Sequence, residues 1–104
     1  MGSRDELMAY SMFRLGLSEL QLGDMSAASA AIEQAIADYP VSLDGKAALA
    51  FRNAATVPGV GLENLSAGCQ AAIAVANQNL QRFQEVWNYG YANPGFDPAK
   101  FCPF

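Results

Sequence analysis

The sequence predicts an all-α fold of about four helices, arranged as antiparallel helical hairpins, with an extended C-terminal tail packed back on the last helix. Three observations predict it. Apolar residues recur at steps of three and four through most of the chain. Glycine, proline and helix-capping residues interrupt this spacing at the expected helix ends. Three prolines between positions 93 and 104 exclude a regular helix from the tail.

The first helix is predicted over positions 5–22 and ends at Gly23. Its apolar side chains form two stripes on different faces. A helix that is apolar on two faces is either buried on both or offers one of them to a partner. The first stripe contains Met8, Met12, Leu15 and Leu22, and the second contains Tyr10, Phe13, Leu17 and Leu20.

The second helix is predicted over positions 25–39. Asp24 is a good N-cap residue because its carboxylate can accept hydrogen bonds from free backbone N–H groups. Pro40 ends the helix, since the residue before a proline avoids the helical conformation. The gap between the first two helices is so short that they are expected to lie antiparallel.

A third helix is predicted over positions 44–56, with Ser42 or Asp44 as its cap, and positions 57–61 form the clearest loop. Asn64 then caps a long fourth helix over positions 65–90. The apolar stripe of this helix is the strongest periodic signal in the chain. It contains Cys69, Ile73, Ala76, Leu80, Phe83, Trp87 and Tyr91.

The two cysteines, Cys69 and Cys102, are predicted to form a disulfide; two free thiols are the alternative. From Cys69 the fourth helix rises about 31 Å to Gly90, and an extended tail can return about 40 Å. The tail can therefore fold back along the helix and bring Cys102 to Cys69. Closing this loop stabilises the fold by about 3–4 kcal/mol. A disulfide places the protein in an extracytoplasmic compartment, either the periplasm or outside the cell.

Composition argues against several classes of function. Only 15% of residues are charged, the net charge is −4, and no basic cluster is present, so nucleic acid is not an expected partner. There is no histidine, and the carboxylates are scattered without spacing suited to acid–base catalysis or metal binding. We therefore predict no enzymatic activity, catalytic residue, metal or cofactor. No apolar stretch is long enough to span a membrane.

At this length we expect a single helical domain over positions 4–104. Residues Met1-Gly2-Ser3 look like a remnant of recombinant expression. We accordingly expect the chain to be the C-terminal part of a longer protein. With so few charged residues, some apolar surface is expected to serve self-association or partner binding.

The first helix pair resembles a tetratricopeptide (TPR) repeat, especially repeats of bacterial cell-envelope proteins. Positions 9–42 match best, 43–91 resemble a degenerate second helix pair, and 92–104 form the tail. Met12 and Glu19 depart from the family, which favours aromatic residues there. The matching residues are Ala9, Leu15-Gly16, Gly23-Asp24, Ala28, Ile32, Ala35 and Pro40.

In this family the first helix of each pair lines a concave groove, so the resemblance implies a site for an apolar peptide or helix. The alternative is that the same side chains pack against the third and fourth helices, or against preceding repeats. An exposed first helix could also pair with a second copy in a homodimer. The implied partner-binding residues are Tyr10, Phe13, Leu17, Leu20, Gln21 and Phe51.

The function that we predict is a protein–protein adaptor. One alternative is a purely structural C-terminal helical domain of a larger secreted or envelope protein, in which the stripe from Tyr10 to Leu20 is buried. Another is a small-ligand carrier with a cavity between the fourth helix and the tail, lined by Ile73, Leu80, Phe83, Trp87 and tail phenylalanines.

Overall fold

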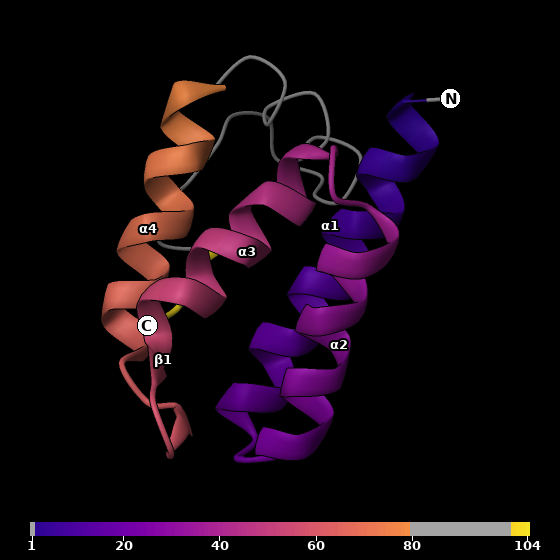
Figure 1. Ribbon diagram of the computed structural model, residues 1–104. Coiled ribbons are helices and arrows are strands. Elements are labelled where there is room, and N and C mark those ends of the chain that lie inside the picture. The colour runs from indigo at the N-terminus through magenta and orange to yellow at the C-terminus, as the bar shows by residue number, and fades with distance from the viewer. Residues whose placement is uncertain (1, 80–100) are drawn as a thin grey trace.

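The computed structural model describes residues 2–79 and 101–104, and most of this part of the chain is helical (Figure 1). Two very short strands lie between the last two helices. The described residues thus confirm the prediction of a mostly helical fold with four helices. Predicted positions 80–91 of the fourth helix and 92–100 of the tail lie outside the described residues. The elements are α1 (Gly2–Gln21), α2 (Met25–Asp38), α3 (Leu43–Ala55), β1 (Thr56–Val57), β2 (Gly61–Leu62) and α4 (Leu65–Gln78).

The helices pack as neighbouring pairs, α1 mainly against α2 and α3 mainly against α4. Figure 1 shows α1 and α2 running antiparallel, with α3 between this pair and α4. The α1–α2 connection is short, and Gly23 adopts a φ of 82° in it. Glycine has no Cβ to oppose this left-handed conformation, which lets the chain reverse at once.

Two of the predicted helix caps form as expected. The Asp24 carboxylate accepts a 3.1 Å hydrogen bond from the backbone N–H of Ala27. At α3 the cap is Ser42, whose Oγ accepts a 2.9 Å hydrogen bond from the N–H of Gly45. Asp44, the alternative cap, is instead fully buried.

The side chain of Asn64 does not cap α4, contrary to the prediction. Asn64 occupies the N-cap position, but its side chain makes no capping hydrogen bond. Backbone hydrogen bonds are present at this helix start. The N–H of Leu65 donates to the carbonyl oxygen of Glu63, and the carbonyl of Asn64 accepts from the N–H of Gly68.

The segment predicted as a loop at positions 57–61 is a small β-hairpin. Thr56 pairs with Leu62 and Val57 with Gly61 in an antiparallel register. Beyond the hairpin, the carbonyl oxygen of Ala55 accepts hydrogen bonds of 3.0 and 2.9 Å from the next two backbone N–H groups, those of Glu63 and Asn64. These bonds connect the end of α3 to the start of α4.

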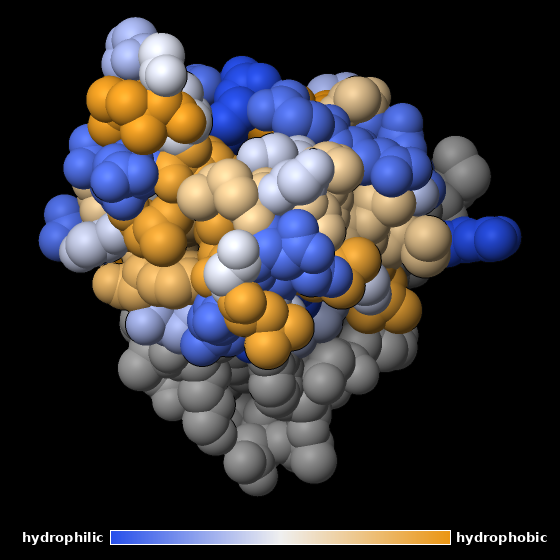
Figure 2. All heavy atoms as spheres, turned by 90° about the horizontal axis from the view of Figure 1, so that it is seen from below, coloured by the Kyte–Doolittle hydropathy of each residue, from blue (hydrophilic) through white to orange (hydrophobic). Residues whose placement is uncertain are grey.

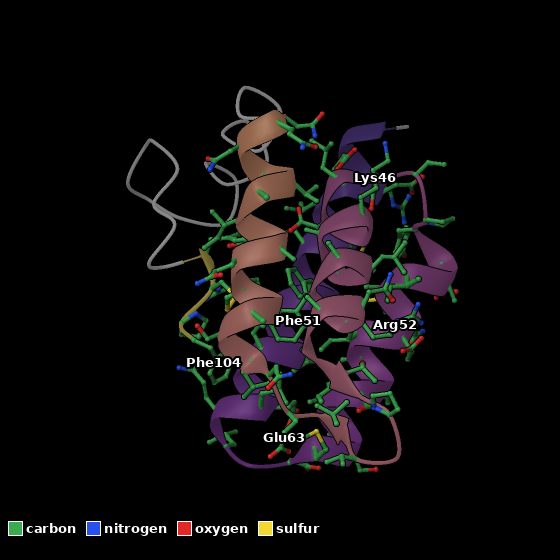
Figure 3. The ribbon with its side chains drawn as sticks, turned by 60° about the vertical axis from the view of Figure 1, so that its left-hand side comes forward. Lys46, Phe51, Arg52, Glu63 and Phe104 are labelled. Atoms are coloured by element: carbon green, nitrogen blue, oxygen red, sulfur yellow. A yellow bond between two sulfur atoms is a disulfide. The ribbon has the colours of Figure 1, made fainter. Side chains whose placement is uncertain are left out.

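The core is built around aromatic rings and close helix contacts. The Phe13 ring meets the Phe51 ring edge to face at 5.8 Å between centroids. Figure 3 shows Phe51 pointing between the helices, where it is fully buried. Gly68 on α4 has no room for a side chain, because an added Cβ would lie 2.9 Å from Phe51.

Candidate functional site

The predicted partner-binding residues lie almost entirely in the core. Only Gln21 is exposed. The groove that the resemblance implied is therefore filled by the chain itself, and the stripe from Tyr10 to Leu20 packs inside the domain. The buried members of the set are Tyr10, Phe13, Leu17, Leu20 and Phe51.

The other apolar stripe of α1 is the one that faces outward. Met8 is 44% exposed, Leu15 53% and Leu22 81%, whereas Met12 is half-buried. We call Met8, Met12 and Leu15 on α1, together with Leu22 in the turn directly after it, the α1 stripe. At 100° per residue it lies nearly opposite the buried stripe. Its exposure makes it the candidate interaction surface of the described chain.

The spacing of the α1 stripe is that of a helix-pairing seam. Met8, Leu15 and Leu22 recur every seven residues, and Met12 lies four residues after the first of them. A repeat of seven with alternating steps of four and three keeps side chains on the seam between two paired helices. Ser11 and Ser18 border the seam, and their small side chains permit close approach by another helix.

Other exposed apolar residues are scattered. Figure 2 views the end of the molecule that carries the α1–α2 turn and the β1–β2 hairpin, and shows hydrophobic residues in separate patches among hydrophilic ones. Val41 and Val60 are strongly exposed, but each is alone in its own connecting segment. Scattered apolar residues of this kind are normal on protein surfaces, so they do not define a second site.

An open groove of about 630 Å³ lies between α2, α3 and the hairpin. Ile32 and Leu62 contribute its apolar lining. Arg52, labelled in Figure 3, extends toward α2 and forms a 2.9 Å ion pair with Glu33 at this groove. The two charged side chains that line this groove are thus paired with each other.

The structure brings together two acidic residues that the sequence analysis treated as scattered. Glu6 on α1 and Asp44 on α3 are both buried. The Glu6 carboxylate accepts a 2.9 Å hydrogen bond from the N–H of Leu43. Neither carboxyl oxygen of Asp44 has a hydrogen-bond partner among the described residues.

Burial is the main cause that raises the pKa of the Asp44 carboxyl from 3.8 to about 8. The negative charge of Glu6 contributes to this increase, and the positive charge of Arg14 partly offsets it. Asp44 is therefore mostly protonated at neutral pH. A signal for this pair existed in the sequence, because Glu6 lies four residues before Tyr10 and so extends the stripe that proves to be buried.

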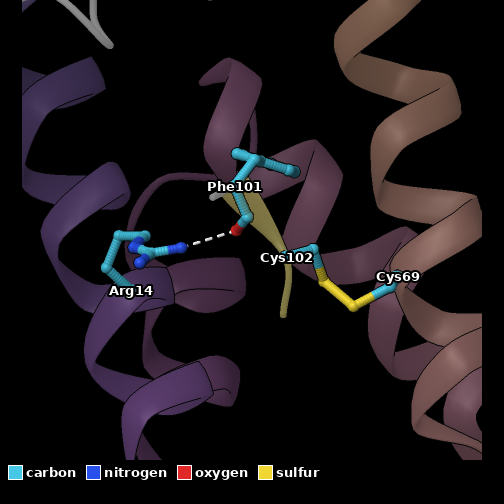
Figure 4. Close-up of a disulfide and its surroundings, with 4 residues drawn as sticks. All are labelled: Arg14, Cys69, Phe101 and Cys102. Carbon is cyan, nitrogen blue, oxygen red and sulfur yellow. Dashed lines mark hydrogen bonds between the residues drawn. A yellow bond between two sulfur atoms is a disulfide. The ribbon is translucent and has the colours of Figure 1, made fainter. Parts of the chain in front are cut away.

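The predicted disulfide is present and joins Cys69 on α4 to Cys102, with their Cα atoms 5.5 Å apart (Figure 4). The preceding residue, Phe101, is fully buried. Its carbonyl oxygen accepts a 2.6 Å hydrogen bond from Arg14 on α1. Residues 101–104 are thus held against α1 and α4, as the predicted return of the tail requires.

The described residues contain no group of three or more side chains suited to holding a metal ion. None of the helices in the described part of the chain is both long and apolar enough to cross a membrane. Of the residues proposed to line a carrier cavity, Leu80, Phe83 and Trp87 lie outside the described residues. Ile73 lines neither the groove between α2, α3 and the hairpin nor a second hollow beside Phe104 at the start of α4.

Comparison with protein-family models, with curated proteins and with solved structures found no match for this chain.

Proposed function

We propose that this protein is a protein–protein interaction module that associates with a second copy of itself through the α1 stripe. The observation that carries the proposal is the outward row of Met8, Leu15 and Leu22 at seven-residue spacing. Burying such a row removes apolar surface from water, which is the main favourable term in association. Methionine adds an adaptable contact, because its unbranched side chain conforms to different surfaces.

A second copy fits this surface when the two α1 helices run antiparallel about Leu15. In that register Leu15 meets Leu15 of the other copy, and Met8 meets Leu22. Glu19, the charged residue within the seam, then faces the hydroxyl of Ser11, so that no like charges oppose each other. Arg4 of one copy approaches the end of the stripe in the other copy that lies next to Asp24. The interface is self-complementary, as two-fold symmetry requires.

The expected association is weak. The α1 stripe runs over about 21 Å of helix and offers four apolar side chains per copy. Stable complexes usually bury at least about 1,200 Å² in total, which is more than one such helix pair provides. We therefore expect a dissociation constant in the micromolar range, typical of a reversible dimer.

Sedimentation equilibrium across a wide concentration range tests the proposal. The natural chain should shift from monomer to dimer, and Leu15→Lys should stay monomeric because it places two ammonium groups face to face. Val41→Lys is the matched control, since Val41 is 83% exposed and lies outside the stripe. A natural chain that stays monomeric at millimolar concentration would contradict the proposal.

The resemblance to TPR repeats remains part of this proposal. It is supported by the close α1–α2 contact, in which a Cβ added to Gly16 would lie 2.6 Å from Ile32. The disulfide supports an adaptor that works in the periplasm or outside the cell. The proposed role requires neither catalysis nor a cofactor.

The second candidate is a purely structural domain of a larger secreted or envelope protein. The burial of the stripe from Tyr10 to Leu20 favours it, since that burial is what a structural element requires. In a structural domain the α1 stripe would be covered by other parts of the parent protein. The isolated chain would then be monomeric, and Leu15→Lys would leave its sedimentation unchanged.

A further inference from the structure

Phe101 occupies a position in this fold that resembles a bound peptide side chain. It is fully buried although it lies far along the chain from the helices that surround it. Its ring meets that of Phe13 edge to face at 5.9 Å between centroids. Phe13 in turn contacts Phe51. The tail residue therefore completes a row of three rings between α1 and α3.

Two further contacts hold the same short segment. Arg14 donates a 2.6 Å hydrogen bond to the backbone carbonyl of Phe101, and Cys69 holds Cys102 covalently. Figure 4 shows these contacts reaching the segment from two different helices. A side-chain pocket combined with a main-chain hydrogen bond is how proteins commonly recognise an extended peptide.

We propose that the site formed by Phe13 and Arg14 of α1 and Cys69 of α4 is a peptide-binding site, filled in the oxidised protein by the chain's own residues 101–104. Once the disulfide is reduced, the site accepts from another molecule an extended peptide with an aromatic residue directly before a cysteine. This inference is independent of self-association, because it uses the face of α1 opposite the α1 stripe.

The exchange follows ordinary thiol chemistry. A dithiol reductant supplies two electrons and two protons, and converts the Cys69–Cys102 disulfide into two thiols. Residues 101–104 then remain tethered through the main chain alone, so an added peptide at sufficient concentration can compete for the site. The Cys69 thiolate can then attack a peptide cysteine that is itself held in a disulfide, which forms the new Cys69–peptide disulfide and releases the other sulfur as a thiolate.

The test uses the full chain carrying Cys102→Ser, in which Cys69 is the remaining thiol. The probe is a synthetic peptide with the sequence of residues 99–104, Ala-Lys-Phe-Cys-Pro-Phe, its cysteine activated as a disulfide with thionitrobenzoate. The Cys69 thiolate attacks the peptide sulfur and expels the thionitrobenzoate anion. Absorbance reports the rate, and mass spectrometry identifies the adduct.

Specific recognition is read from a ratio of rates. The peptide should react about tenfold faster than the same peptide with alanine in place of its phenylalanine next to cysteine, since an anchored aromatic side chain contributes at least that much to binding. The small disulfide of thionitrobenzoate with itself measures the plain accessibility of Cys69. Adding Phe101→Ala to the protein should raise the rate with the phenylalanine peptide further, because the internal competitor has gone.

Equal rates for the two peptides with Cys102→Ser would overturn the proposal. Loss of the helical circular dichroism of Cys102→Ser would overturn it as well, because the site must survive release of the tail. The double variant with both Cys102→Ser and Phe101→Ala could unfold while Cys102→Ser stays folded. In that case the ratio of the two peptides' reaction rates, measured with Cys102→Ser alone, tests the proposal.

Discussion

Glu6 on α1 holds the first turn of α3, because its Oε2 atom accepts a 2.9 Å hydrogen bond from the backbone N–H of Leu43. The first N–H groups of a helix have no partner within the helix. Glu6 supplies one for α3 from a helix 37 residues earlier in the chain. This contact connects the first helix pair to the second.

Removing this acceptor should destabilise the fold. Glu6→Ala removes the acceptor of the buried Leu43 N–H. The free energy of unfolding should therefore fall by about 1–3 kcal/mol. Urea denaturation measures the change. Glu33→Ala is the control, since it breaks an exposed ion pair and should cost less than about 1 kcal/mol. Equal losses for the two variants would show that the Glu6 contact is unimportant.

Asp44 should make stability fall as pH rises. Its pKa is about 8 in the folded protein against 3.8 ordinarily, so the folded state holds a proton that the unfolded chain releases. The free energy of unfolding should therefore decrease between about pH 4 and pH 8, by at most about 1.4 kcal/mol per pH unit from this group. Asp44→Asn should remove this part of the slope. Parallel stability curves for the natural chain and the variant would contradict it.

Phe101 should contribute more to stability than its place near the end of the chain suggests. Because its ring is fully buried against Phe13, Phe101→Ala should cost about 3–5 kcal/mol with the disulfide intact. Phe104→Ala is the control, since Phe104 is only half-buried and its loss should cost clearly less. Thermal unfolding of the oxidised proteins compares them. A smaller loss for Phe101→Ala than for Phe104→Ala would refute the packing.

Gly68→Ala should destabilise the protein although alanine is the better helix former. The gain in helix propensity is about 1 kcal/mol. However, the added Cβ would lie 2.9 Å from both Ala55 and Phe51, and overpacking of this kind costs about 1–3 kcal/mol. Ser66→Ala, at an exposed position of α4, should leave stability nearly unchanged. Chemical denaturation measures the free energy of unfolding of both variants. A Gly68→Ala variant more stable than the unmodified protein would show that α3 and α4 can move apart at this position.

The sequence predicted the local structure of the described helices well because their ends are set by local chemistry. Asp24 caps α2 within its own first turn, and α2 ends at Asp38, just before Tyr39 and Pro40. The β-hairpin was missed, since its strands are two residues long and too short to show alternation. The hydrogen bonds that follow the hairpin, from Glu63 and Asn64 to Ala55, depend on how α3 meets α4.

The candidate site could not be assigned from periodicity alone. Both stripes of α1 have helical spacing, and the sequence does not state which one the other helices cover. The choice depends on tertiary contacts, such as Ile32 against Gly16 and Phe101 against Phe13. The pairing of Glu6 with Asp44 was missed for the same reason, because the two residues lie on different helices.

Cross-linking at Leu15 tests the central claim of self-association most directly. In an antiparallel pair centred on this residue, the two copies of Leu15→Cys face each other. Mild oxidation should therefore produce a disulfide-linked dimer rapidly, and much faster than Val41→Cys, which is exposed but lies outside the α1 stripe. If both variants cross-link at the same slow, collision-limited rate, α1 does not pair with a second copy.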